Sequence, residues 1–210
     1  MVKIRSKSVW KEKAEEEVYR MLTQAFGKEK IRLEPKVNGK KVDFLVETED
    51  VYIEVYSVKD ITSDITKETQ YSANVDIIEI RKKKVLDRLA GKIQHESTQL
   101  PDEAKNILII KTEDPYVPAH DVAEVFMEPI LVVNRKTLQT KIKYQHSFRT
   151  DSEMMEILEK ISAIIVYEKV CPHKKLCGIF LNNGDNAKFP LNAKNLSVFE
   201  GMICNECTCT

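Results

Sequence analysis

Two acidic side chains, Asp43 and Glu54, are the residues of this sequence that are best placed to do chemistry. They lie in the stretch 42–57, VDFLVETEDVYIEVYS, where apolar and polar residues alternate. The alternation predicts two antiparallel strands, 41–47 and 50–57, joined by a polar turn. With the loop centred on the middle of that turn, the hairpin register places Asp43 directly opposite Glu54.

Opposed carboxylates on an antiparallel pair have Cβ atoms roughly 5 Å apart and repel each other unless a cation lies between them. A hard divalent metal ion such as Mg²⁺ is the natural cation for carboxylate oxygens. The alternation predicts that the apolar residues 42, 44, 46, 51, 53 and 55 share a buried face and that both acids share the other face. In the alternative interpretation, the acids are solvated on an outward face and bind no metal.

The elements before the hairpin supply a third acid. Apolar residues at helical spacing predict a helix over 8–26 that ends at Gly27, and Glu17 is the acid of this helix that points toward the core. The alternative for Glu17 is a position beside the apolar stripe without a function. A strand over 31–37 and an Asn-Gly turn lead into the hairpin, which makes three consecutive antiparallel strands.

After the hairpin, a polar segment without a clear period, 58–74, predicts a loop. A second helix is predicted over 75–98, and basic residues line one flank of its apolar stripe. Of these, Lys92 can bury its stem and present its ammonium group to a neighbouring site. The alternative for Lys92 is a lysine that reaches solvent at the core boundary.

The rest of the chain alternates strands and helices. Short apolar runs predict buried strands, and helical spacing together with a capping box predicts two helices between them. The strands are expected at 106–111, 129–133 and 163–167. One helix is expected at 120–127, and another runs from the capping box at 150–153 to 161. Such alternation after an initial meander predicts a mixed α/β domain.

All five cysteines lie in the last 40 residues, which does not suggest a disulfide framework. Four of them are candidate ligands of a structural zinc ion: Cys171, Cys177, Cys204 and Cys207. The alternative is a flexible cysteine-rich tail. We therefore expect a small C-terminal extension from about Val170.

The 210 residues carry a formal net charge of zero, with 42% hydrophobic and 31% charged residues. These values are typical of a globular protein, and no apolar run approaches the ~20 residues that a membrane span needs. Without an apolar signal core at the N-terminus, we expect a cytoplasmic protein without a membrane partner. Any contact with nucleic acid depends on local basic patches, because the overall charge contributes no attraction.

The order of these features resembles the PD-(D/E)xK nuclease superfamily. The order is a helix with an inward glutamate, a strand meander, an aspartate, a glutamate after ten intervening residues, and a second helix. The resemblance spans about residues 10–111, with Asp43 and Glu54 at the two acidic motif positions. It implies a restriction-endonuclease-like α/β fold, with a mixed central sheet flanked by helices. The expected domains are a nuclease domain over 1–169 and the cysteine-containing extension over 170–210.

The resemblance implies a nuclease that hydrolyses DNA phosphodiester bonds with Mg²⁺ or Mn²⁺ held by Asp43 and Glu54, and with Glu17 as an auxiliary acid. Tyr56 occupies the position of the family lysine, so the water-positioning cation is assigned to Lys92, with Lys59 next. Arg81, Arg88 and Lys59 are expected to contact phosphates. Many related nucleases are homodimers, and this chain is a candidate for the same assembly. The alternative is a degenerate module that binds nucleic acid or a protein partner without cleavage.

Overall fold

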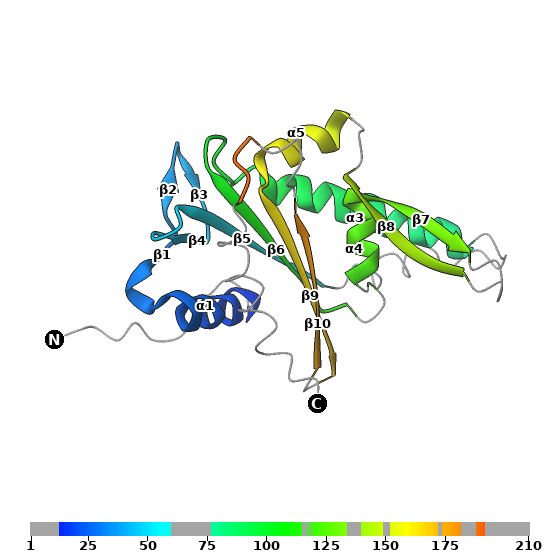
Figure 1. Ribbon diagram of the computed structural model, residues 1–210, viewed down its shortest axis with the longest axis horizontal. Helices are drawn as coiled ribbons and strands as arrows, with labels where there is room; N and C mark the ends of the chain where they lie inside the picture. The colour runs from blue at the N-terminus through cyan, green and yellow to red at the C-terminus, as the bar shows by residue number, and fades with distance from the viewer. Residues whose placement is uncertain are drawn as a thin grey trace.

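A mixed β-sheet forms the centre of the computed structural model, which describes residues 13–59, 77–114, 117, 119–133, 140–148, 152–171, 174–181 and 188–191. Six described strands follow one another across this sheet in the order β1-β4-β5-β6-β9-β10 (Figure 1). Their bounds are Ile31–Leu33, Phe44–Val46, Val51–Val58, Lys105–Thr112, Ala163–Cys171 and Lys174–Leu181. The helices are α1 (Lys13–Phe26), η1 (Lys28–Lys30), α3 (Ile77–Ser97), α4 (Ala119–Phe126) and α5 (Ser152–Lys160). The chain is therefore an α/β protein with a mixed sheet packed against helices.

The predicted hairpin is confirmed as β4 and β5. These strands pair antiparallel with Val46 opposite Val51 and Phe44 opposite Ile53, which is the predicted register. β1 pairs antiparallel with β4, so the first three strands of the sheet form a meander. The predicted strand 31–37 is split, because Glu34 adopts a positive φ of 49° just before Pro35.

The predicted Asn-Gly turn lies in a small excursion from the meander. Asn38 and Gly39 have φ values of 51° and 79°, and they connect β2 (Lys36–Val37) to β3 (Lys40–Lys41). Two successive positive φ values are what a tight two-residue hairpin turn requires. The excursion brings the chain to Val42, which is followed by Asp43 and then by β4.

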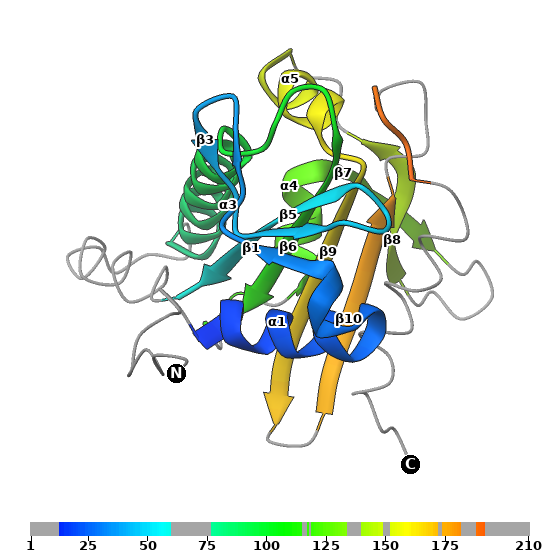
Figure 2. The same ribbon diagram turned by 90° about the vertical axis from the view of Figure 1, so that its left-hand side faces the viewer.

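Helices cover both faces of the sheet (Figures 1 and 2). One core, which we call the α1-side core, joins α1 to apolar residues of the sheet: Phe44, Val46, Val51, Ile53, Val55, Ile107, Ile109 and Ile165. The other, the α3-side core, joins α3, α4 and α5 to the opposite face: Val58, Leu108, Ile110, Ile164 and Val166. Because side chains alternate along a strand, Glu54 lies on the α3 side of β5.

Both faces of the hairpin are therefore buried, and the expectation of one buried face needs correction. The sequence shows the alternation of Ile53, Glu54 and Val55 but not the helix that covers the acidic face. Val42 also departs from its expected face. It is 1% exposed and packs in the α3-side core.

The later elements complete the sheet. β6 is buried at its centre and runs parallel to both β5 and β9, as α/β crossovers require. The apolar strand expected at 129–133 is β7 (Met127–Val133), but it pairs with β8 (Thr140–Phe148) in a separate two-stranded sheet. The expected domain boundary near Val170 falls inside β9, and β10 continues the main sheet beyond it.

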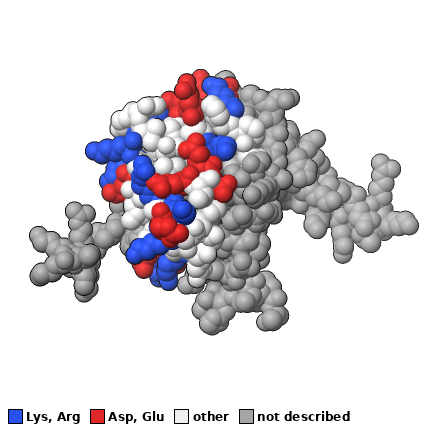
Figure 3. Space-filling view, turned by 60° about the vertical axis from the view of Figure 1, so that its left-hand side comes forward, with Lys and Arg blue, Asp and Glu red and all other residues white. Residues whose placement is uncertain are grey.

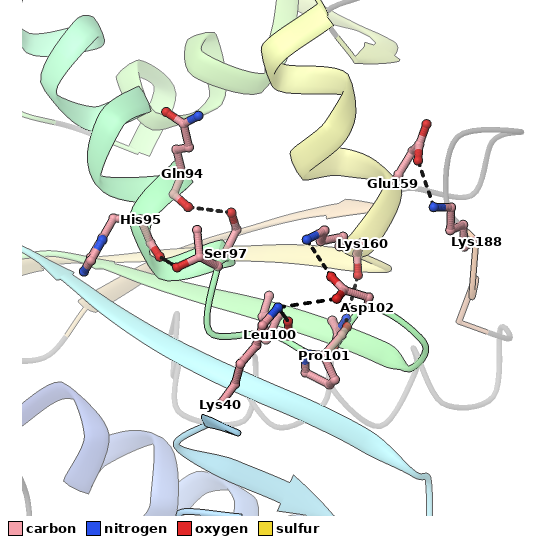
Figure 4. A network of polar contacts seen from close by, with 12 residues as sticks. Lys40, Gln94, His95, Ser97, Leu100, Pro101, Asp102, Glu159, Lys160 and Lys188 are labelled. Atoms are coloured by element: carbon pink, nitrogen blue, oxygen red, sulfur yellow. Dashed lines mark hydrogen bonds and ion pairs between the residues drawn. The ribbon is translucent and has the colours of Figure 1, made fainter. Parts of the chain in front are cut away.

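A polar network holds the start of β6 (Figure 4). Asn106, which is fully buried, donates from Nδ2 to the backbone oxygens of Pro101 at 2.7 Å and Lys160 at 2.8 Å. The side chains of Lys40 and Lys160 both reach Asp102, at 3.5 Å and 2.5 Å. These contacts join β3, the segment between α3 and β6, and the end of α5 at one end of the central strand.

Several sequence predictions lie outside the described residues. They are the start of the first helix at 8–12, most of the loop at 58–74, and Cys204 and Cys207 at the C-terminus. None of the described helices is both long enough and apolar enough to cross a membrane.

Candidate metal site and a buried lysine on the opposite face

The structure brings Asp43 and Glu54 together at the start of β4. The backbone N–H of Asp43 donates to Glu54 Oε2 at 3.2 Å, and the backbone N–H of Val55 donates to Asp43 Oδ2 at 3.0 Å. The Glu54 carboxylate thus accepts from the backbone N–H of Asp43, and the Asp43 carboxylate accepts from the residue that follows Glu54. The two residues are 6% and 2% exposed, so the alternative of solvated surface acids is wrong.

The physical reason for this geometry is the end of the β4–β5 ladder. The pairing begins at Phe44 and Ile53, so the amide of Asp43 is satisfied by a side chain rather than by the partner strand. Two carboxylates gathered in a buried setting repel each other, and a bound cation relieves that repulsion. Mg²⁺ fits such a pair, since it usually binds one or two carboxylates and keeps several waters.

A further acid, Glu96 of α3, is half-buried and accepts a hydrogen bond from Gln99 Nε2 at 2.9 Å. Burial and the nearby Asp43 carboxylate raise the pKa of Glu96 above its ordinary value, although His95, Gln99 and Lys92 act in the opposite direction. Burial is the largest of these causes.

The predicted cations are placed differently from one another. The Lys92 side chain is exposed on α3, whereas Tyr56 is half-buried and packs against the α3-side core. Lys59 follows β5 and forms an ion pair with Glu113 at 3.4 Å. Arg88 is half-buried in α3, and the side chain of Arg81 in the same helix lies outside the described part of the structure.

The structure separates Glu17 from Asp43 and Glu54, because Glu17 lies on the α1 side of the sheet. There its carboxylate contacts Lys111 Nζ at 2.9 Å, and Glu113 contacts the same ammonium at 2.5 Å. The Lys111 side chain is 2% exposed, and that of Glu17 is 11% exposed. Glu17 points inward as predicted, but its observed partner is a lysine.

Burial acts to lower the pKa of Lys111, but the hydrogen bonds and charges of Glu113 and Glu17 outweigh it and raise that pKa. Burial acts to raise the pKa of Glu113, and the Lys111 and Lys59 ammonium groups outweigh it, so this pKa is lowered. Lys111 is therefore a charged lysine between two carboxylates. Sequence reasoning missed this role because Lys111 ends an apolar run and Glu17 lies far earlier in the chain, although Glu113 is only two positions away.

The cysteines with a described backbone do not meet. Cys177 of β10 pairs with Tyr167, which is four residues from Cys171 along β9. Four residues of strand correspond to roughly 13 Å. A zinc ion with Zn–S bonds of about 2.3 Å does not span that distance. Cys171 and Cys177 are thus not brought to one ion, and the other two candidate ligands lie outside the described residues.

The described surface seen in Figure 3 mixes basic and acidic side chains. Ion pairs among the described residues include Arg32 with Glu47 at 2.5 Å and Lys41 with Glu34 at 2.6 Å. Because neighbouring charges neutralise each other, this face does not present a patch of one sign to a phosphate backbone.

Within the described part of the chain, no three His, Cys, Asp or Glu residues are grouped so that together they could hold a metal ion. A metal at Asp43 and Glu54 would therefore take its other ligands from water or substrate. The chain matches no family model, no curated protein and no solved structure.

Proposed function

We propose that this protein is a metal-dependent nuclease that hydrolyses DNA phosphodiester bonds, with Asp43 and Glu54 as ligands of Mg²⁺ or Mn²⁺. The observation that carries the proposal is the buried Asp43–Glu54 pair, in which the Glu54 carboxylate accepts from the backbone of Asp43 and the Asp43 carboxylate accepts from the residue after Glu54. Such a pair is costly to bury unless a cation or a proton offsets its charge. A bound divalent cation would remove the repulsion between the two carboxylates, and this relief would contribute to the affinity of the site for the ion.

The arrangement of the elements supports a restriction-endonuclease-like fold. The chain passes from α1 through the antiparallel strands β1, β4 and β5 to α3 and then to the parallel strand β6. This order agrees with the helix, strand meander and second helix of the resemblance. Both acids also occupy the positions of the meander that the motif assigns to them.

The chemistry follows from the ligand set. A divalent ion held by two carboxylates keeps open positions for a phosphate oxygen and a water molecule. The ion polarises the phosphodiester and makes the bound water a better nucleophile by lowering its pKa. The protein would contribute position and charge, which dominate catalysis of phosphoryl transfer.

The test is cleavage of plasmid and single-stranded DNA with Mg²⁺ or Mn²⁺ by the wild type, Asp43→Asn and Glu54→Gln. Both substitutions keep the side-chain volume and a carbonyl oxygen for the amide hydrogen bond. We expect each to reduce cleavage at least 100-fold and to remove the stabilisation of the wild type by Mn²⁺. The matched control is Glu103→Gln, an exposed glutamate, which should behave as the wild type. Full cleavage by Glu54→Gln would contradict the assignment.

The second candidate is a degenerate module that binds nucleic acid or a protein partner without cleavage. It is favoured by Tyr56 at the family lysine position and by the exposure of Lys92 on α3. DNA binding by the wild type without cleavage under any metal condition would select this candidate. If Mn²⁺ then stabilises the wild type but not Asp43→Asn, Asp43 is still a ligand of a metal site.

A further inference from the structure

Two tyrosines, Tyr52 and Tyr56, flank Glu54 on the same face of β5. Side chains alternate along a strand, so residues two positions apart share a face, and their Cα atoms are roughly 7 Å apart. Glu54 lies on the α3 side of β5, and both tyrosines pack against the α3-side core. Along β5, the acid is therefore bordered by an aromatic side chain on either side.

The side chains on this face of β5 differ in their access to solvent. Glu54 and Val58 are almost fully buried, whereas Tyr52 and Tyr56 are half-buried. A tyrosine combines an apolar ring with a polar tip, so it can pack on a core and still present part of its side chain at the surface. A ligand that approaches Glu54 along β5 thus meets two aromatic side chains before it meets the carboxylate.

The charge of the protein does not supply the affinity for a nucleic acid. Neutralisation of phosphates by basic side chains provides most non-specific binding. Here the formal net charge is zero, and the described surface in Figure 3 mixes both signs. Lys59, the first basic residue after β5, is already paired with Glu113 at 3.4 Å. The other general source of affinity is the stacking of bases on aromatic side chains.

We propose that the substrate is single-stranded DNA and that Tyr52 and Tyr56 stack against its bases. The inference rests on the proposed function and names the substrate class of the same site. The bases of a single strand can turn toward an aromatic ring, whereas those of a duplex must first be unstacked and unpaired. Stacking on either side of Glu54 would hold the intervening phosphate beside the acidic pair.

The burial of the acids favours the same substrate. Asp43 and Glu54 lie below the surface, so the scissile phosphate must approach the protein more closely than the rest of the nucleic acid does. Duplex DNA has a persistence length of about 50 nm and is stiff over the length of a binding site. A single strand bends freely and can place one phosphate in a recessed position.

The test is binding of a fluorescently labelled oligo(dT) strand, followed by anisotropy at one salt concentration in EDTA, so that cleavage does not consume the probe. We expect Tyr52→Leu and Tyr56→Leu each to weaken binding about 10-fold, as loss of one stacked base does. Tyr56→Phe keeps the ring and should bind within about threefold of the wild type. The matched control is Tyr19→Leu, which removes a half-buried tyrosine that stacks on Phe44 on the α1 side.

Two further measurements separate binding from folding. Urea unfolding of each variant shows whether the leucine substitutions leave the protein folded. In the wild type, a strand that carries 5-bromodeoxyuridine should crosslink on irradiation to Tyr52 or Tyr56, which mass spectrometry of the peptides identifies. Crosslinks at other residues alone would overturn the inference, whether or not the leucine variants fold.

The outcomes separate this inference from the proposed function. If folded Tyr52→Leu and Tyr56→Leu bind the strand as tightly as the wild type, or if the wild type binds a labelled duplex more tightly than the strand, the inference is overturned. Cleavage with Mn²⁺ by the wild type would then still support the metal site. If binding depends on the tyrosines but the wild type cleaves no DNA, the stacking site is upheld and the nuclease function fails.

Discussion

Replacing Lys111 by methionine should strongly destabilise the protein. The ammonium group of this lysine lies between the carboxylates of Glu17 and Glu113, and its side chain is 2% exposed. Methionine has a similar length and fits an apolar setting, so the change removes the charge and leaves the packing volume almost unaltered. What remains is two carboxylates that have lost their shared cation.

The magnitude follows from the exposure of those carboxylates. Removing one partner of a buried ion pair costs about 3–5 kcal/mol, because the other charge stays buried without compensation. Glu17 is 11% exposed and Glu113 is 25% exposed, so Glu113 recovers part of its hydration. We therefore expect the lower end, about 3 kcal/mol of unfolding free energy, which for a chain of this size is a fall of about 6–12 °C in Tm.

The assay is urea unfolding followed by circular dichroism, with Lys105→Met as the matched control. Lys105 lies on the same strand, is half-buried and contacts a backbone oxygen at 3.3 Å, so its loss should cost less than about 1 kcal/mol. Adding Glu17→Gln to Lys111→Met should recover part of the lost stability, because it removes one uncompensated charge. A Lys111→Met variant as stable as the wild type would refute the reasoning.

Three further outcomes are expected. Asn106→Leu removes the donor of one buried and one partly buried hydrogen bond to backbone oxygens, which should cost about 1–3 kcal/mol of unfolding free energy for the buried one and less for the other. An unchanged urea midpoint would disprove this. Gly27→Ala should lower the unfolding free energy by about 1–3 kcal/mol, because φ at Gly27 is 90°. Gly91→Ala in α3 should instead raise the unfolding free energy by about 0.5–1 kcal/mol. A variant with the Tm of the wild type would contradict the prediction made for it. Because the pKa of Glu113 is lowered in the folded protein, its ionised carboxylate stabilises the fold fully at pH values above the ordinary pKa of 4.5, and this stabilisation is lost as the pH falls below 4.5. The difference in unfolding free energy between the wild type and Lys111→Met should therefore become smaller in acid.

The acidic pair shows how far the sequence predicts the site. Alternation and the polar turn predicted the register of β4 and β5, and the structure confirms that register as far as Phe44 opposite Ile53. Asp43 lies just beyond the paired residues, where its backbone N–H donates to the Glu54 carboxylate. Register is a local property, because slipping by one residue would turn every side chain to the other face. Alternation does not predict which helix covers each face of the strands. Here α3 buries the face that was expected to be polar.

The lysines show the complementary limit. Helical spacing predicted α3 and its flanks, but whether Lys92 faces the site depends on how the helix is rotated and packed, and in the structure Lys92 is exposed. Lys111 pairs with an acid 94 positions earlier in the sequence, a distance over which no local pattern carries information.

The sequence by itself determined the local elements: α1 with its stop at Gly27, the hairpin and its register, α3, and the buried strand β6. These depend on periodicity and turn chemistry, which act over a few residues. Only the tertiary structure decided which side of the sheet each acid occupies. It placed Glu17 with Lys111 on the α1 side and Glu54 with Asp43 under α3, because those positions follow from strand order and helix packing across the whole sheet.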